Sequence, residues 1–281
     1  MTPTRTTTKR APAAKAPRAK TASPKASPKS AKAPRARMSL AQAMDALKKA
    51  GSEQTRKTYA RHGGTGPMFG VSFAFLKELT KKIDVDHELA LALWDTGNFD
   101  ARNLAVKIVD PARMSSADLD RWSRGVPQVR MCSGYVGMVA GEGPHAAKKV
   151  EQWLGADEEN VRCQAWTLLA HLAQRDEAAG DAPFEKRLDQ IERTIAAAPN
   201  VERDVMNSAV IAIGLRSPGL KKAALAASKR IGRVEVDHGD TACKTPDAVA
   251  SIEKAWAYAT AKGHASPAAL ERTRETPRRR C

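Results

Sequence analysis

The sequence predicts an all-α fold, a solenoid of stacked antiparallel helical hairpins that begins near residue 38. From Met38 onward, apolar residues recur at steps of three and four, which is the spacing of one face of an α-helix. Strand-like alternation is scarce, and most connections are short, so neighbouring helices are expected to pack antiparallel. One arginine also recurs near the start of four expected helices, which indicates a repeated structural unit.

The expected helices follow one another with little intervening chain. Asp, Asn or Ser precedes several of them, as an N-cap residue does, and Thr245-Pro246 has the pattern of an N-cap followed by proline in the first turn. Only residues 234–236 have the pattern of an extended segment. The expected helices span residues 40–50, 54–61, 72–82, 87–94, 101–109, 116–124, 129–140, 144–154, 160–174, 184–197, 202–215, 219–231 and 246–261.

The repeated arginines give the expected solenoid its register. Each is followed by a run of small or apolar residues, and the intervals between them are 28, 32 and 41 residues. Tryptophan ends the preceding helix in three repeats, and Ile195 takes that place in the fourth. These lengths are typical of HEAT-like or armadillo-type hairpins, in which each unit buries its apolar face against the next. The arginines are Arg102, Arg130, Arg162 and Arg203, and the tryptophans are Trp94, Trp122 and Trp153.

A ladder of arginines along the inner helices is suited to a phosphate backbone, because a guanidinium binds phosphate through two parallel hydrogen bonds. In the alternative interpretation, each arginine bonds to a carboxylate or to helix-end carbonyls of the neighbouring repeat. Both interpretations stay open for any single arginine. Taken as a group, the four favour contact with DNA.

Charge is distributed unevenly along the chain. Of the net charge of +16, residues 1–37 carry +11 and residues 265–281 carry +3, which leaves +2 for residues 38–264. Residues 1–37 are rich in Ala, Lys, Pro and Ser and resemble linker-histone tails, so we expect a disordered arm for a polyanion. A solubilising tail without a partner is the alternative, and organelle import is a lesser one. We expect a HEAT-like repeat domain over 38–264 and a flexible Arg-rich tail over 265–281.

Several classes of protein are excluded. No apolar stretch approaches the roughly 20 residues that span a bilayer, and the N-terminus lacks the apolar core of a secretory signal. None of the four cysteines forms a CxxC pair, so neither a metal site nor a cofactor is expected. We expect a monomer in the cytoplasm, associated with the nucleoid if the source is bacterial.

Two segments outside the repeats are dense in residues that carry chemistry. The glycine-rich residues 61–72 have backbone N–H groups that, with Arg61, could hold a phosphate, although a tight inter-helix turn is favoured. Residues 234–248 contain Asp237, His238, Asp240 and Cys243, whose spacing matches no known zinc site. An ordered loop is favoured there, a DNA contact through Lys244 is the second possibility, and a metal site is a distant third. Lys244 could also act as an imine-forming amine.

The tryptophans are candidates for stacking on bases or for shielding a cationic lesion. Three of them recur in the repeat register, which favours packing between repeats. Trp166 lies four residues after Arg162 on the same helix face, so it is the tryptophan that we expect to contact DNA.

Three stretches of the sequence resemble the DNA alkylation repair family of HEAT-like repeat glycosylases: MFGVSFAFLKELTKKI (68–83), ELALALWDTGNFDARNLAVKIVDP (88–111) and VEVDHGDTACKTPDA (234–248). The resemblance covers roughly residues 40–262. It implies a concave face that cradles double-stranded DNA, alkylated or branched, and that excises N3- or N7-alkylated purines without base flipping. It also implies a catalytic aspartate that stabilises the developing sugar cation, with aromatic residues beside the sugar.

The sequence departs from this pattern at the catalytic positions. Val129 stands where the family has tryptophan, Ser133 stands where it has aspartate, and Ala212 takes the later aromatic position. No carboxylate lies between Trp122 and Glu142. Three hypotheses follow: a glycosylase whose acid is Asp100 or Asp237, a non-catalytic binder of DNA structures, and a protein–protein scaffold. The missing carboxylate favours the second over the first, and the arginines favour both over the third.

Overall fold

The computed structural model describes residues 1–3, 37–126 and 135–280. The chain divides into two units, Met1–Ala36 and Arg37–Cys281. The second unit contains the helices, and the description below concerns that unit alone. Arg130, Val129 and Ser133 lie outside the described residues.

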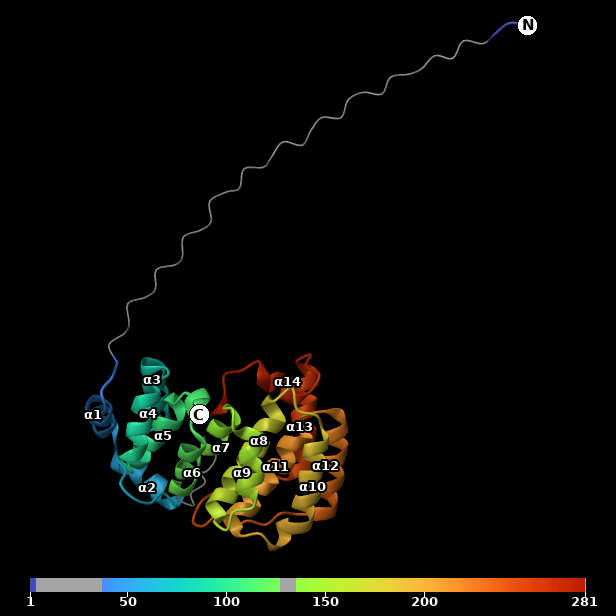
Figure 1. Cartoon of the computed structure of the whole chain (residues 1–281). Helices are drawn as coiled ribbons and strands as arrows, with labels where there is room; N and C mark the ends of the chain where they lie inside the picture. Colours follow the sequence, from blue (N-terminus) through green and yellow to red (C-terminus); the bar gives the residue numbers. More distant parts are fainter. Residues whose placement is uncertain (4–36, 127–134, 281) are drawn as a thin grey trace. The chain divides into compact units, whose positions relative to one another are not determined.

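The described residues form fifteen α-helices and no β-strand, which confirms the all-α prediction (Figure 1). Only one isolated antiparallel β-bridge occurs among them, between Gly51 and Val71. Residues 234–236, which alone had the pattern of an extended segment, belong to no strand. Two short α-helices begin the unit, Leu40–Ala50 (α1) and Glu53–Arg61 (α2).

The next helices form two layers, which alternate along the chain as stacked hairpins do (Figure 1). The outer layer contains α4 (His87–Asp95), α6 (Ser116–Gly125), α8 (Ala146–Leu154), α10 (Ala182–Thr194) and α12 (Pro218–Ile231). The inner layer contains α3 (Phe73–Ile83), α5 (Phe99–Ile108), α7 (Tyr135–Gly141), α9 (Glu159–Arg175), α11 (Asn200–Gly214) and α13 (Ala248–Ala261). Single turns of 3₁₀-helix, Pro111–Arg113 and Ile195–Ala197, lie in the connections.

The core runs continuously between the two layers. α9 packs against α7 on one side and α11 on the other, and α5 is buried along nearly its whole length. The Trp94 and Trp122 rings stack in parallel with 4.2 Å between their centroids, and they join the ends of two successive outer helices. Because Trp153 is also buried, the prediction that these three tryptophans pack between repeats is confirmed.

The C-terminal segment differs from the flexible tail that we expected for residues 265–281. Residues 266–280 contain two further helices, α14 (Pro267–Arg272) and α15 (Pro277–Arg280), and Arg278 is only 3% exposed. α14 packs on α9, and α15 packs on α3, α5 and α7, so the chain end returns across earlier repeats (Figure 1). Arginine-rich composition indicated a solvated tail, but here the arginines are bonded to helix ends and carboxylates.

None of the helices in the described part of the chain combines the length and the apolar character needed to cross a bilayer.

Candidate nucleic-acid interface

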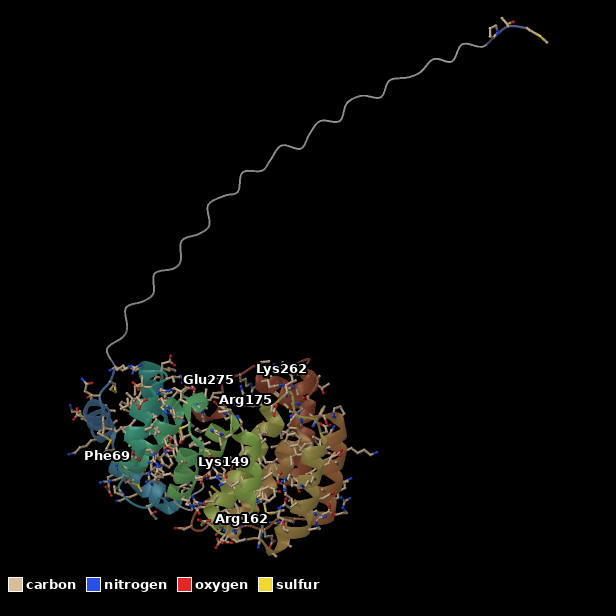
Figure 2. The ribbon with its side chains drawn as sticks, in the orientation of Figure 1. Phe69, Lys149, Arg162, Arg175, Lys262 and Glu275 are labelled. Atoms are coloured by element: carbon tan, nitrogen blue, oxygen red, sulfur yellow. The ribbon has the colours of Figure 1, made fainter. Side chains whose placement is uncertain are left out.

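The inner helices begin at one edge of the solenoid, and their first-turn arginines lie there. Figure 2 shows Arg162 and Arg175, from the two ends of α9, at opposite edges. We call the edge that contains the starts of α5, α9 and α11 the arginine edge. The sequence placed Arg102, Arg162 and Arg203 at equivalent positions, and each lies in the first turn of its inner helix.

Arg102 connects the start of α5 to the ends of two outer helices. Its Nη1 donates to the carbonyl of Gly125 at 2.8 Å, and its Nε donates to the carbonyl of Trp94 at 3.3 Å. The guanidinium also lies over the Trp94 ring, 5.0 Å from the centroid. Carbonyls at a helix end lack intrahelical partners and carry partial negative charge, which accounts for the cation there.

Arg162 has the same arrangement and an ion pair in addition. Its Nη1 donates to the carbonyls of Ala156 and Asp157, just beyond the end of α8, at 2.9 and 2.6 Å. Its Nε and Nη2 face the carboxylate of Glu202 in α11, with 2.9 Å from each nitrogen to Oε2. This carboxylate raises the pKa of the Arg162 guanidinium, against the opposing effect of burial. The charge of Arg162 is therefore compensated within the protein.

Within the described part of the chain, the hydrogen-bond partners of the Arg203 guanidinium are all backbone carbonyls. It donates to the carbonyl of Ala198 at 2.9 Å, to that of Ala196 at 3.4 Å and to that of Glu235 at 3.1 Å. Arg102, Arg162 and Arg203 thus share a structural role, in which each fastens an inner helix to the end of the outer helix before it. Their contact with DNA stays a prediction.

Trp166 is not available to stack on a base, which corrects the hypothesis drawn from its position beside Arg162. The side chain is 2% exposed, and its Nε1 donates to Glu202 Oε1 at 3.1 Å. Because α9 packs between two neighbouring inner helices, the helix face that carries Arg162 is covered by α11. Helical spacing shows that two residues share a face, but it does not show what covers that face.

Asp100 is a structural residue rather than a candidate catalytic acid. Its carboxylate is fully buried and accepts from the backbone N–H groups of Phe69, Gly70 and Val71 at 2.6, 3.1 and 2.9 Å. A carboxylate so engaged cannot reach a sugar. The backbone N–H groups of the glycine-rich segment, which were candidates for binding phosphate, bind the Asp100 carboxylate instead. Gly70 has φ +79°, and an added Cβ would lie 2.4 Å from the carbonyl oxygen of Ser52. The turn interpretation of this segment is therefore supported.

The loop before α13, residues 232–247, borders a hollow of about 940 Å³ beside the start of α11. Asn200, Arg203 and Asn207 lie three and four residues apart along α11 and donate to the carbonyls of Asp237, Glu235 and Pro246. The ordered-loop interpretation is thus supported.

Two of the loop's candidate residues have different roles in it. The Asp237 carboxylate accepts from the N–H of Gly239 at 2.8 Å, as a turn-forming aspartate does, whereas the Lys244 side chain is exposed. The described residues contain no group of three or more potential metal ligands.

A second hollow, of about 310 Å³, lies on the inner layer between α7, α9 and α11. Asp204, Ser208 and Ala212 line it from successive turns of α11, and His171 lines it from α9. Burial lowers the pKa of His171 to about 4, so the imidazole is neutral near pH 7. Asp204 was not among the candidates predicted from the sequence, although its spacing of four from Ser208 and of eight from Ala212 marks one helix face.

Comparison with known proteins gives the family. The model of the DNA alkylation repair enzyme family matches residues 43–251, which is most of the chain. The chain belongs to the DNA alkylation repair family. Uncharacterized proteins of Listeria monocytogenes and Listeria innocua are each 26% identical to this family member over 208 residues, covering 72% of this chain and 90% of theirs.

A solved structure extends the comparison to three dimensions. It belongs to a protein of "a new family of proteins related to the HEAT-like repeat DNA glycosylases with affinity for branched DNA structures". The TM-score is 0.71 and the identity 29%, and the match covers 81% of this chain and 96% of that one. The predicted HEAT-like repeat architecture and the predicted family are both confirmed.

Proposed function

We propose that this member of the DNA alkylation repair family binds DNA through its solenoid and prefers branched DNA to linear duplex. The observation that carries the proposal is the match, over 81% of the chain at 29% identity, to a protein described as having affinity for branched DNA. A shared fold does not by itself transfer a function, so the proposal also depends on the cations that this chain exposes to phosphate.

The positive charge for this binding comes mainly from outside the repeat arginines. The eleven Lys and Arg residues of residues 1–37 meet no acid in that segment, so they supply a strong attraction for phosphate that carries no sequence information. Arg61, at the end of α2, and Lys244, in the loop before α13, have exposed side chains. Lys244 borders the same hollow as Arg203, and we assign both exposed cations to phosphate contacts.

We further propose that binding occurs without excision of a base. An excising member of the family needs a carboxylate beside the sugar, to stabilise positive charge that develops there. The described helix α7 contains no acidic residue, and Glu142, which follows it, is bonded to Arg278 and Thr276. Asp100 is enclosed by backbone N–H groups. A monomer that works in the cytoplasm or at the nucleoid fits this role.

One observation favours excision as a second candidate. Asp204 lines the hollow on the inner layer, together with Ser208, where DNA would approach an inner-face site. If this carboxylate served in place of the family aspartate, the chain would release N3- or N7-alkylated purines. Substitution of Asp204 by asparagine would then abolish release and leave DNA affinity nearly unchanged.

Binding and release can be measured with one set of DNA substrates. The full chain is titrated into a labelled four-way junction and into a linear duplex with the same arm sequences. We expect the junction to bind about tenfold more tightly, a difference of about 1.4 kcal/mol. Duplex that contains N7-methylguanine is incubated in parallel, and we expect no base release. Equal affinity for the two DNAs contradicts the preference, and base release that Asp204→Asn abolishes establishes the second candidate.

A further inference from the structure

Residues 266–280, here called the strap, run along the edge of the solenoid opposite the arginine edge. The N–H of Ala268 donates to the carbonyl of Leu215, at the end of α11, at 3.1 Å. Arg175, at the end of α9, donates to the strap carbonyls of Glu271 and Arg274 at 3.0 and 3.1 Å. Along its length the strap therefore meets α11 first and α9 next, the reverse of their order in the chain. The strap lies beyond residues 43–251, which match the family model.

The second half of the strap continues to three further helix ends. The Arg278 guanidinium donates through Nη1 to the carbonyls of Val106 and Lys107 in α5, at 2.7 and 3.1 Å. Its Nε donates to Glu142, just after α7, at 2.9 Å. Arg279 donates to Asp84, at the end of α3, also at 2.9 Å. One segment thus touches the ends of α11, α9, α7, α5 and α3.

The contact at Arg278 is buried and specific in its geometry. Arg278 is 3% exposed and Lys107 is fully buried, and Lys107 Nζ donates to the carbonyl of Arg278 at 2.9 Å. Lys107 Nζ also lies 4.9 Å from the centre of the Tyr135 ring at the start of α7. Buried ionic contacts of this kind add little net stability compared with apolar packing, but they tolerate few alternative arrangements. A role in positioning the helices therefore accounts for them better than a role in stability.

A solenoid needs such positioning because each repeat contacts only its neighbours, so small rotations accumulate along the stack. The strap connects repeats that are not adjacent. Lys107 bonds to Arg278 across 171 positions of the chain, and Asp84 bonds to Arg279 across 195. Glu271 and Pro277 of the strap also border the inner-layer hollow.

We propose that the strap fixes the spacing of the inner helix ends and thereby sets the inner-layer curvature on which a preference for branched DNA depends, with Arg278 as its positioning residue. The DNA part of this inference rests on the proposed function. The mechanical part, the fixed spacing of the helix ends, stands on the strap contacts alone.

The test compares Arg278→Gln with Arg274→Gln in the full chain. Arg274 belongs to the same strap, but its side chain is 43% exposed and its ion pair with Glu271 is 4.0 Å long, so its loss controls for charge and for position in the strap. Two quantities are measured: hydrogen exchange at the ends of α5, α7 and α9, and the ratio of affinities for a four-way junction and a linear duplex.

For Arg278→Gln we expect faster exchange at these three helix ends and a fall in the affinity ratio of roughly 5- to 10-fold. Duplex affinity should change less than about twofold, because loss of curvature does not remove the cations that contact phosphate. Arg274→Gln should leave both quantities unchanged. A purely structural role for Arg278 would weaken binding to both DNAs alike and would leave their ratio unchanged.

Arg279→Gln provides a second test, because it removes the connection with α3 together with an ion pair to Glu275 inside the strap, and leaves the Arg278 contacts in place. It is expected to fold even if Arg278→Gln does not. It should speed exchange at the end of α3 and lower the affinity ratio by a smaller factor. If neither variant alters exchange or the ratio relative to Arg274→Gln, the proposal is overturned. If the wild-type chain shows no preference for the junction, the proposed function fails, and faster exchange in the variants still establishes the mechanical part.

Discussion

Arg162 in α9 and Glu202 in α11 form an ion pair between neighbouring inner helices, with the carboxylate 2.9 Å from both Nε and Nη2 of the guanidinium. Glu202 also accepts from the Trp166 indole. The pair therefore fixes the register of two successive repeats. It also compensates the positive charge of Arg162, which the sequence alone indicated as available for phosphate.

Loss of this carboxylate should destabilise the fold. We expect Glu202→Gln to lower the free energy of unfolding by roughly 2 to 3 kcal/mol, because the guanidinium is left partly buried without a counter-charge. This is less than for a fully buried pair, since the Arg162 side chain is 22% exposed. Glu192→Gln is the matched control, because its partner Arg230 is 58% exposed. Urea denaturation should show a much smaller loss for the control, because an exposed ion pair is screened by solvent, and equal losses in the two variants would contradict the assigned role.

Trp166 should affect stability rather than DNA binding. In Trp166→Phe the hydrogen bond to Glu202 is lost in a buried setting, which should cost roughly 2 kcal/mol. Affinity for duplex and for junction DNA, measured well below the unfolding transition, should change less than about twofold. A loss of affinity without a loss of stability would show that this indole reaches the DNA.

Asp100→Asn should loosen the segment that joins α2 to α3. An asparagine offers one acceptor oxygen and places an NH₂ group near backbone donors, so the three N–H bonds from Phe69, Gly70 and Val71 cannot all be kept. We expect a loss of about 2 to 3 kcal/mol in chemical denaturation. If base release is detected in the wild-type protein, this variant should retain it, and its abolition in a still-folded variant would restore Asp100 as an acid.

His171 should make stability depend on pH in the acidic range. Its pKa in the folded protein is about 4, below the ordinary value of 6.5, so between these values the unfolded chain binds more protons. The contribution of the neutral His171 to the free energy of unfolding is therefore complete above pH 6.5. It is lost as the pH falls towards 4, by at most about 3 kcal/mol. Denaturation midpoints of the wild type and of His171→Gln, measured from pH 7 to pH 4, should converge as the pH falls. Parallel curves would show that His171 does not titrate abnormally.

The repeat architecture could be predicted from the sequence because its causes are local. Apolar spacing, capping residues and the intervals between arginines each act within a few turns, and they placed the helices and the equivalence of Arg102, Arg162 and Arg203. What those arginines bind depends on groups that arrive from other repeats. Glu202 lies 40 residues from Arg162, and no local pattern identifies it as the partner.

The strap and the role of Asp100 could not be predicted for the same reason. Five arginines in residues 265–281 have the composition of a solvated tail, and only the assembled solenoid offers the helix-end carbonyls and Glu142 that bury Arg278. Asp100 lies in the first turn of α5, where an aspartate is ordinary, while its partners lie about 30 residues earlier. The candidate site is thus defined by long-range contacts, and the fold mainly by short-range ones.

The salt dependence of binding tests the central claim, that the solenoid itself contacts DNA, most directly. Affinity for the four-way junction is measured across salt concentrations for two variants of the full chain. In the first protein, the eleven Lys and Arg residues of residues 1–37 are changed to Gln. The combined variant adds Arg61→Gln and Lys244→Gln to these changes. We predict measurable binding for the first protein, with a log–log slope that becomes shallower by roughly 1 to 2 in the combined variant, because each lost phosphate contact removes nearly one unit. Lys186→Gln, which alters an exposed residue of α10, should leave the slope unchanged. If binding vanishes once the N-terminal charges are removed, the solenoid does not hold DNA and the account is contradicted.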